Sequence, residues 1–240
     1  MNASVVVFLP GLLCDEAVWS AQCRALTQVH CKVASFDLLS SITAMAQQVL
    51  AQTEAPRFSL AGHSMGGRVA LEMVRLAPQR IERLALLDTG MDALAPGEAG
   101  AAERAKRMAL LKLAHQEGMR AMGRQWALGM VHPSRRNTPL FDAVLDMIAR
   151  KTPAVFEAQI EALLARPDAR AVLEGVDCPV LLLCGRQDVW SPLSRHEQMQ
   201  TLTPGSRLAV IEDAGHMTTM EAPERVSAAL AAWLHQRSAD

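Results

Sequence analysis

The chain has 240 residues, enough for one large α/β domain or two small ones, and its 50% hydrophobic composition can supply a sizeable core. Its formal net charge of −1 gives no electrostatic basis for binding nucleic acid or an anionic membrane, so neither is expected as a partner. The five cysteines are odd in number and lack zinc-site spacing, which favours reduced thiols, a cytoplasmic location and no bound metal.

The first apolar run, Val5–Leu9, has the continuous hydrophobicity of a parallel strand that is buried on both faces. It differs from a signal peptide because no Lys or Arg precedes it and because Pro10 and Gly11 end it. It is also too short to span a membrane. We therefore expect a buried strand at this end of the chain.

Three further runs continue this pattern along the first part of the chain. A weaker strand is expected at Lys32–Asp37, and others at Arg57–Ala61 and Leu84–Leu87. Amphipathic helical patterns separate them, one of them following the serine caps Ser40 and Ser41. Such βα units predict right-handed crossovers and a doubly wound, mostly parallel α/β sheet.

Ser64 stands between glycines at positions 62 and 66, directly after one predicted strand and before a helix. Small residues at these two places let the chain turn sharply, in a strained conformation that lifts the serine hydroxyl above the sheet edge. An ordinary βα turn with incidental glycines is the alternative. The position between strand and helix favours a catalytic nucleophile.

The helix after Ser64 has one apolar stripe that includes Val69 and Met73, and an opposite polar stripe. Arg68 and Glu72 fall on the polar stripe, four residues apart. This phasing predicts that Arg68 is a solvated residue near Glu72 and does not hold a substrate.

The pattern changes between Met91 and about Asp168, where no strand-like run is found. Helical patterns follow one another there, at Glu98–Gly118, Met119–Gly129, Pro139–Lys151 and Pro153–Ala165. We expect residues 1–90 and 171–240 to form the core and residues 91–170 to form an inserted all-helical cap. The core pattern resumes with strands at Pro179–Cys184 and Arg207–Ile211 and closes with an amphipathic helix near Pro223–Gln236.

Serine needs a base to take its proton, and that base needs a partner that fixes its tautomer. Asp188 follows the next-to-last predicted strand, and His216 lies in the loop after the last one. Since the carboxyl ends of parallel strands share one edge of the sheet, Ser64, Asp188 and His216 are expected to meet there. Asp88, after the fourth strand, is the competing candidate for the acid.

A tetrahedral intermediate also needs hydrogen-bond donors for its oxyanion. The N–H of Met65 follows the nucleophile at a helix N-terminus, and the N–H of Leu12 lies beyond the bend at Pro10 and Gly11. These two amides are the predicted oxyanion hole. Gly11 would let the backbone approach the oxyanion closely.

Together these segments resemble the α/β-hydrolase fold, in the form of a small serine hydrolase with a helical cap. The resemblance covers essentially the whole chain and is carried by residues 8–11, 61–67, 185–192, 214–217 and 221–224. It implies esterase, lactonase, thioesterase or carbon–carbon hydrolase activity on a small molecule, without a metal or organic cofactor. Two departures are visible: Pro-Gly replaces the usual His-Gly before the oxyanion loop, and the chain starts at the family's third strand.

Without the family's leading hairpin, the sheet is expected to hold about six strands. The strand near Lys32–Asp37 would then be a bare edge, which can pair with another copy in a homodimer.

The substrate pocket is less defined by the sequence. Met122 and Trp126 recur at helical spacing in the cap, where they either pack the cap onto the core or line an apolar pocket. Trp190, two residues after the predicted acid, is open to the same two interpretations. Arg124 could hold a substrate carboxylate or simply be solvated, as could Arg135 and Arg136.

The predicted activity is hydrolysis of a small to medium carboxylic ester or lactone through an acyl-enzyme intermediate. The same three residues could instead serve thioester hydrolysis, carbon–carbon bond hydrolysis or elimination. A ligand-binding member of the fold without turnover is the alternative outside enzymes, and the complete set of Ser64, Asp188 and His216 argues against it.

Overall fold

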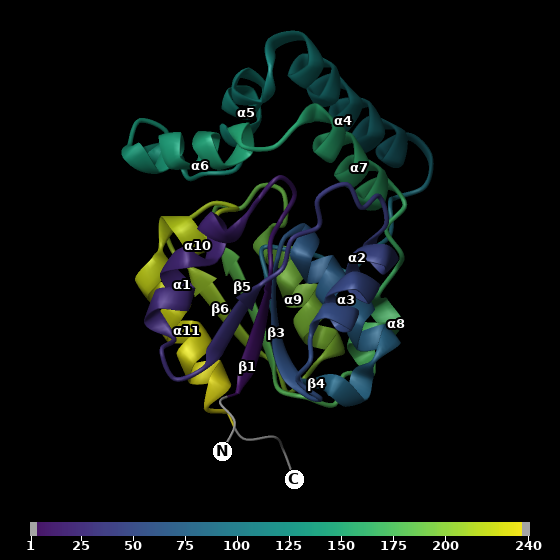
Figure 1. Ribbon diagram of the computed structural model, residues 1–240, viewed down its shortest axis with the longest axis vertical. Coiled ribbons are helices and arrows are strands. Elements are labelled where there is room, and N and C mark those ends of the chain that lie inside the picture. The colour runs from purple at the N-terminus through teal and green to yellow at the C-terminus, as the bar shows by residue number, and fades with distance from the viewer. Residues whose placement is uncertain (1–3, 237–240) are drawn as a thin grey trace.

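The structure, a computed structural model, describes residues 4–236. Within them six strands form one sheet in the order β2-β1-β3-β4-β5-β6, and every neighbouring pair is parallel (Figure 1). The strands are β1 (Val5–Leu9), β2 (His30–Val33), β3 (Phe58–His63), β4 (Ile81–Leu87), β5 (Val180–Gly185) and β6 (Arg207–Ile211). The predicted doubly wound α/β fold is confirmed.

Helices cover both faces of this sheet, with α1 and α11 on one face and α2, α3, α8 and α9 on the other (Figure 1). Because both faces are covered, β3 and β5 are buried along their whole length and consist mostly of apolar residues. The helices are α1 (Ser20–Ala25), α2 (Ile42–Gln52), α3 (Met65–Leu76), α8 (Arg170–Glu174), α9 (Leu193–Leu202), α10 (Thr218–Glu221) and α11 (Pro223–Leu234).

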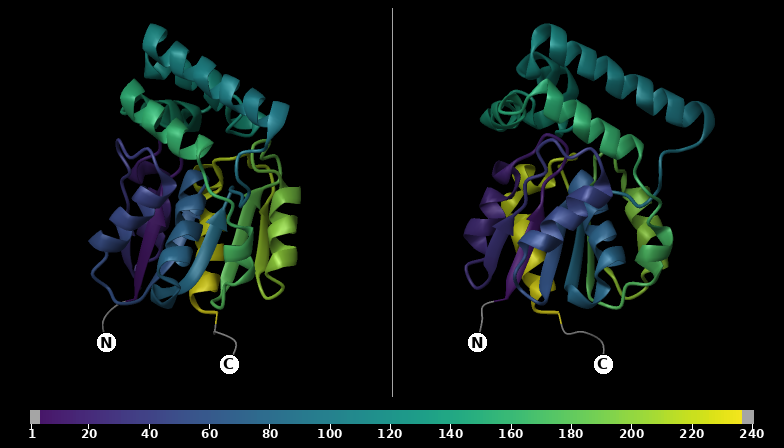
Figure 2. Two further views of the ribbon diagram at one scale, coloured as in Figure 1. Left: turned by 90° about the vertical axis from the view of Figure 1, so that its right-hand side faces the viewer. Right: turned by 45° about the vertical axis from the view of Figure 1, so that its right-hand side comes forward.

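Four more helices lie between β4 and β5 in the sequence and sit above the carboxyl edge of the sheet (Figure 2). They are α4 (Gly97–Glu117), α5 (Met119–Ala127), α6 (Pro139–Ala149) and α7 (Pro153–Leu164). Their bounds agree with the helical patterns of the sequence to within about two residues. The division into a core and a cap stays a prediction; residues 1–3 and 237–240 of its ranges lie outside the described part.

The predicted strand at Lys32–Asp37 is wrong in its bounds, since β2 begins at His30 and ends at Val33. Beyond β2 the chain turns, with the Leu39 N–H donating to the Phe36 carbonyl and with φ of Asp37 at +39°. The strand does lie at one edge of the sheet. A homodimer through this edge stays a prediction.

Across residues 4–236, no helix combines the length and the apolar character that crossing a bilayer requires.

Candidate active site

Ser64 links the end of β3 to the start of α3 and has φ +53° and ψ −115°, a strained region for a residue with a side chain. Two backbone contacts hold it there: its N–H donates to the Leu87 carbonyl at 2.9 Å, and its carbonyl accepts from the Thr89 hydroxyl at 2.6 Å. The turn thus anchors on β4 and projects the serine into the cavity above the sheet.

Gly62 and Gly66, the two glycines that flank Ser64, lie where backbone segments approach too closely for a Cβ atom. A Cβ at Gly62 would lie 2.4 Å from the carbonyl oxygen of Gly66, and a Cβ at Gly66 would lie 2.0 Å from that of Leu9. Both distances are far inside van der Waals contact. The start of α3 therefore packs directly on the chain leaving β1.

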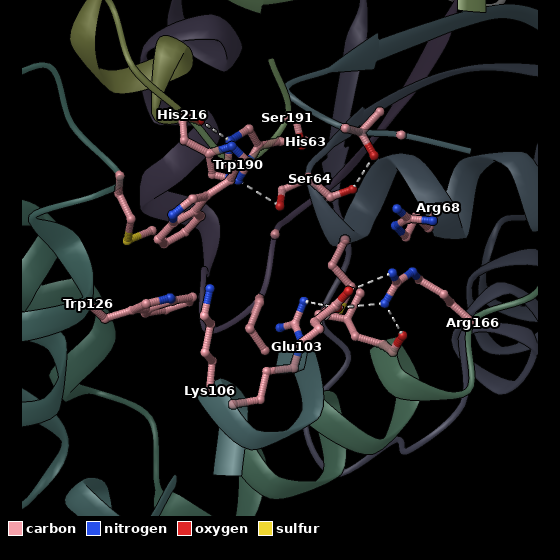
Figure 3. A pocket seen from close by; sticks show the side chains of 18 of the residues that line it. His63, Ser64, Arg68, Glu103, Lys106, Trp126, Arg166, Trp190, Ser191 and His216 are labelled. Carbon is pink, nitrogen blue, oxygen red and sulfur yellow. Dashed lines mark hydrogen bonds and ion pairs between the residues drawn. The ribbon is translucent and has the colours of Figure 1, made fainter. Parts of the chain in front are cut away.

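His216 and Asp188 complete a chain of two short contacts with the serine, of which Figure 3 shows the one between Ser64 and His216. His216 Nε2 lies 2.8 Å from Ser64 Oγ, and His216 Nδ1 lies 2.8 Å from Asp188 Oδ2. The loops after β5 and β6 supply these residues, so the carboxyl edge of the sheet brings them together as the sequence predicts.

The second oxygen of Asp188 is held by the backbone. Asp188 Oδ1 accepts from the Trp190 N–H at 2.8 Å and from the Ser191 N–H at 2.9 Å. Burial opposes ionisation, but the adjacent His216 and these two N–H donors outweigh it and keep the pKa of Asp188 below its ordinary value. Asp188 is therefore an ionised carboxylate that fixes the orientation of the imidazole.

Asp88, the competing candidate, has different partners. Its Oδ1 accepts from the Gly185 N–H at 3.0 Å, and its Oδ2 accepts from the Thr218 hydroxyl. Burial and the nearby charge of Asp188 raise the pKa of Asp88 well above its ordinary value. Asp188 therefore contacts the His216 ring, whereas Asp88 links the end of β5 to the segment that follows His216.

His63 borders the cavity beside His216 and is buried. Its Nε2 is 2.8 Å from the carbonyl oxygen of His216, to which it donates. Burial, and then the neighbouring His216, lower the pKa of His63 to about 3, so the ring is neutral at physiological pH. His63 therefore supports the backbone of the loop that carries the candidate base.

The predicted oxyanion donors both border the cavity, Leu12 after β1 and Met65 at the start of α3. The loop of Leu12 is fixed from the cap side, because the Leu13 N–H donates to Gln159 Oε1 at 2.9 Å. Among the backbone hydrogen bonds of residues 4–236, the amides of Leu12 and Met65 have no acceptor. Both amides are available to a negatively charged oxygen near Ser64.

A cavity of about 510 Å³ opens above Ser64, between the carboxyl edge of the sheet and the cap helices. Its size lies in the range of small-molecule sites. Trp126 and Trp190 line it with their rings stacked at 5.2 Å between centroids, and Trp190 lies 5.0 Å from the His216 ring. These two tryptophans form an aromatic wall beside the candidate base.

Two residues predicted for the pocket do not border it. Met122 is fully buried and is not among the residues that line the cavity, and its helix packs on both α4 and α6. Arg124 is exposed on the other side of the same helix. Helical spacing related Met122 to Trp126 and the charge of Arg124 suggested a carboxylate ligand, but neither signal reveals which side of α5 faces the cavity.

The prediction that Arg68 is a solvated residue near Glu72 is wrong. Arg68 borders the cavity and does not pair with Glu72. Glu72 is itself buried and accepts from Arg75 and from the Thr43 hydroxyl. Arg68 instead donates to the Asp92 carbonyl oxygen at 2.7 Å. Burial, reinforced by the charges of neighbouring arginines, lowers the pKa of Arg68 to about 9.

A segment of the cap also touches the loop of His216. The His216 N–H donates to the Met130 carbonyl at 2.6 Å, while buried Glu221 accepts from the N–H groups of His132, Gly215 and Met217. Glu221 belongs to the segment 221–224 that carries the family resemblance, but the sequence alone assigned it no role. These hydrogen bonds fix the His216 loop to the segment between α5 and α6 and to α10.

A metal site would need several ligating side chains in one place. In the part of the chain that the structure describes, no three His, Cys, Asp or Glu side chains gather in a way that could hold a metal ion.

Comparison with known proteins agrees with this architecture. The chain is 34% identical over 172 residues to the pimeloyl-(acyl-carrier protein) methyl ester esterase of Aromatoleum aromaticum, covering 68% of each chain. The enzyme of the same name from Nitrosomonas europaea is 28% identical over 239 residues, covering 93% of each. Among solved structures, a thermophilic esterase from Thermogutta terrifontis with malate bound superposes with a TM-score of 0.84 at 28% identity, covering 97% of this chain and 90% of that one.

The sequence profile of the alpha/beta hydrolase family matches residues 6–229, a range that includes all of β1 but its first residue, the helices α4 to α7 and the loop of His216. The chain belongs to the alpha/beta hydrolase family.

Proposed function

We propose that this enzyme is a serine hydrolase that cleaves a small to medium carboxylic ester or lactone through an acyl-enzyme. The observation that carries the proposal is the unbroken contact from Ser64 Oγ through His216 to Asp188, with both distances at 2.8 Å. A nucleophile, a base and an orienting carboxylate in this order are what acyl transfer by a serine requires.

In the first half of the proposed reaction, Ser64 Oγ attacks the ester carbonyl carbon while His216 Nε2 takes the hydroxyl proton. The oxyanion that forms accepts hydrogen bonds from the Leu12 and Met65 amides, each worth about 3 kcal/mol in the transition state. His216 then gives the proton to the departing alcohol oxygen, and the acyl group stays on Ser64.

In the second half, water attacks the acyl-enzyme carbonyl, and His216 again removes the proton. Collapse of the second tetrahedral intermediate releases the acid and returns the proton to Ser64. Asp188 stays ionised throughout and stabilises the imidazolium that forms twice in the cycle. The positive end of the α3 dipole lies at the same place as the Met65 amide and favours the developing negative charge.

The cavity and the relatives support the proposed substrate class. A cavity of about 510 Å³ with an aromatic wall suits a small molecule, and the relatives from Aromatoleum aromaticum and Nitrosomonas europaea are named as methyl ester esterases. We therefore propose a small-molecule ester as the partner of this enzyme, acted on without cofactor in the cytoplasm. Lactone, thioester and carbon–carbon substrates fit the same chemistry and form further arms of the test.

The test is turnover of p-nitrophenyl acetate and butyrate together with labelling by a fluorophosphonate. We expect the wild type to hydrolyse and to label, and Ser64→Ala to lose both, with kcat lower by a factor on the order of 10⁶. Ser194→Ala, at an exposed serine in α9, is the matched control and should behave as the wild type. A folded wild type that neither turns over nor labels would remove the proposal, as would label that persists in Ser64→Ala.

A further inference from the structure

The cavity above Ser64 has a charged side as well as an aromatic one. Figure 3 shows Trp126 and Trp190 on one side of Ser64, with Arg68 and Arg166 on the other. Five cations and one carboxylate border this cavity, namely Arg68, Lys106, Arg107, Arg166, Arg195 and Glu103. The chain as a whole has a formal net charge of −1, so this excess of positive charge is a local feature of the cavity.

The one carboxylate is shared by two of these arginines. Glu103 accepts from Arg166 Nη1 at 2.7 Å and Nη2 at 2.9 Å, and Arg107 Nη2 also donates to it at 2.9 Å. Burial opposes the ionisation of Glu103, but these hydrogen bonds and charges outweigh it and lower the pKa of its carboxyl group to about 2. Glu103 is therefore fully occupied and cannot compensate the remaining cations.

Three cations of the cavity have no carboxylate partner within the described residues, namely Lys106, Arg195 and Arg68. Arg68 is the one that lies on α3, the helix that follows Ser64. Within residues 4–236 its guanidinium makes one hydrogen bond, to the Asp92 carbonyl oxygen, although a guanidinium has five N–H donors. The Asp92 carboxylate points elsewhere and pairs with Arg170 at 2.9 Å. A half-buried cation that faces a cavity beside other cations costs free energy unless an anion joins it.

The position of Arg68 relates this charge to the reaction. Ser64 precedes the first residue of α3, and Arg68 follows four residues later, which is about one helical turn on the same face. Arg195 extends over the chain after β4, where a Cβ on Gly90 would lie 2.5 Å from Arg195 Cδ. The charged side thus begins close to the nucleophile.

We propose that Arg68, with Arg166 and Arg195 beside it, binds a carboxylate carried by the substrate at a distance from the ester that Ser64 attacks. The substrate class is then a monoester of a dicarboxylic acid, with its apolar portion against Trp126 and Trp190. Guanidinium groups suit this task because they donate to a carboxylate through two parallel N–H groups. The inference rests on the proposed serine hydrolase and specifies its substrate.

The kinetic test compares monomethyl succinate, glutarate and adipate with neutral methyl esters of equal chain length. We expect the wild type to favour the acidic esters in kcat/KM. In Arg68→Met the ratio of kcat/KM for acidic over neutral esters should fall about 10- to 100-fold, the loss of a hydrogen bond between charged groups. Arg68→Lys should recover part of the ratio, because the charge remains while the paired donors are lost.

Arg104→Met is the matched control, since Arg104 is an exposed arginine of α4 that does not border the cavity. It removes the same charge from the chain and should leave the ratio as in the wild type. If the ratio of kcat/KM for acidic over neutral esters fell equally in Arg104→Met, the effect would come from the net charge of the protein, and the proposal would be overturned. A wild type that does not prefer acidic esters would overturn it as well.

A binding measurement separates this inference from the proposed reaction. Adipate is titrated by calorimetry into the Ser64→Ala protein and into the same protein carrying Arg68→Met, with dimethyl adipate as the neutral reference. Adipate binding that Arg68→Met abolishes supports the carboxylate site even if no ester is hydrolysed. Ester turnover without adipate binding would keep the proposed hydrolase activity but overturn the proposed carboxylate site. Tighter binding of inorganic phosphate than of adipate would overturn the assignment of this site to a carboxylate.

Discussion

Two buried carboxylates, Asp88 and Asp188, lie near one histidine, and their hydrogen-bond partners give them different roles. Asp188 meets the His216 ring and two backbone N–H groups, which together stabilise its ionised form. Asp88 accepts from Gly185 and Thr218, and burial raises its pKa. A difference in local donors thus separates an orienting carboxylate from a structural one.

From this difference we predict that Asp188→Asn lowers kcat for p-nitrophenyl acetate by a factor of about 10⁴, because an amide no longer stabilises the imidazolium or its tautomer. Asp88→Asn keeps an acceptor for the Gly185 N–H and should change kcat by less than about tenfold. Steady-state kinetics on both variants, with circular dichroism to verify folding, make the comparison. A larger effect in Asp88→Asn would reverse the two roles.

At the scale of single residues, the sequence located Ser64, Asp188 and His216 because few residue types do this chemistry and because strand ends share one edge. It failed for Arg68. Helical periodicity says which residues share a face of α3, but α4 and α7 come from a distant part of the chain and line the same cavity as Arg68. Which residues border a cavity depends on such long-range packing, and local spacing does not encode it.

At the scale of elements, the unit of β3, the Ser64 turn and α3 depends on close packing against β1. Gly66 sits where a Cβ would lie 2.0 Å from the Leu9 carbonyl oxygen, and that atom belongs to the backbone of a central strand. Such a contact cannot be relieved by rotating a side chain. The helix that begins beside Ser64 would have to move away from the sheet.

We therefore predict that Gly66→Ala lowers the free energy of unfolding by about 2–3 kcal/mol and also lowers kcat, because displacement of α3 moves Ser64 and the Met65 amide. Chemical denaturation and ester kinetics measure the two effects. Gly205→Ala is the control: a Cβ there meets no atom within 4 Å, so stability and activity should stay within about 0.5 kcal/mol and twofold. A Gly66→Ala protein as stable and active as this control would contradict the close packing of α3 on β1.

Most long elements were predictable from the sequence, since an apolar run or an amphipathic stripe needs several residues to be recognised. The short helices α8 and α10 were not predicted, because five and four residues are too few to show a period. The bounds of β2 were wrong because an edge strand that is only half buried carries a weak pattern.

At the scale of the whole molecule, the segment between α5 and α6 meets the loop that carries the candidate base. Glu221 accepts three backbone N–H groups, one from the cap at His132 and two from the loop at Gly215 and Met217, at 2.7, 2.9 and 3.2 Å. Burial raises the pKa of this carboxyl group despite those donors. The Glu221 side chain therefore fixes the position of the His132 segment relative to the His216 loop.

We predict that Glu221→Ala lowers the free energy of unfolding by about 3 kcal/mol, because it leaves buried N–H groups without an acceptor. It should also lower kcat at least tenfold, since His216 loses its fixed position. Glu224→Ala, at an exposed glutamate in the first turn of α11, should leave both quantities unchanged. Thermal unfolding and ester kinetics test this, and a Glu221→Ala protein with full activity would show that the loop is held by other contacts.

The order of the site residues along the chain has a consequence for synthesis on the ribosome. Gly66 and the strand β1 on which it packs come early, and the candidate base His216 comes later. The nucleophile turn, its glycines and both predicted oxyanion amides are translated within the first third of the chain, while the base comes near its end. A nascent chain can fold its first strands early, yet Ser64 has no partner to take its proton until the loop after β6 has emerged. The enzyme would therefore be silent toward esters until that loop has been translated and has folded against Ser64.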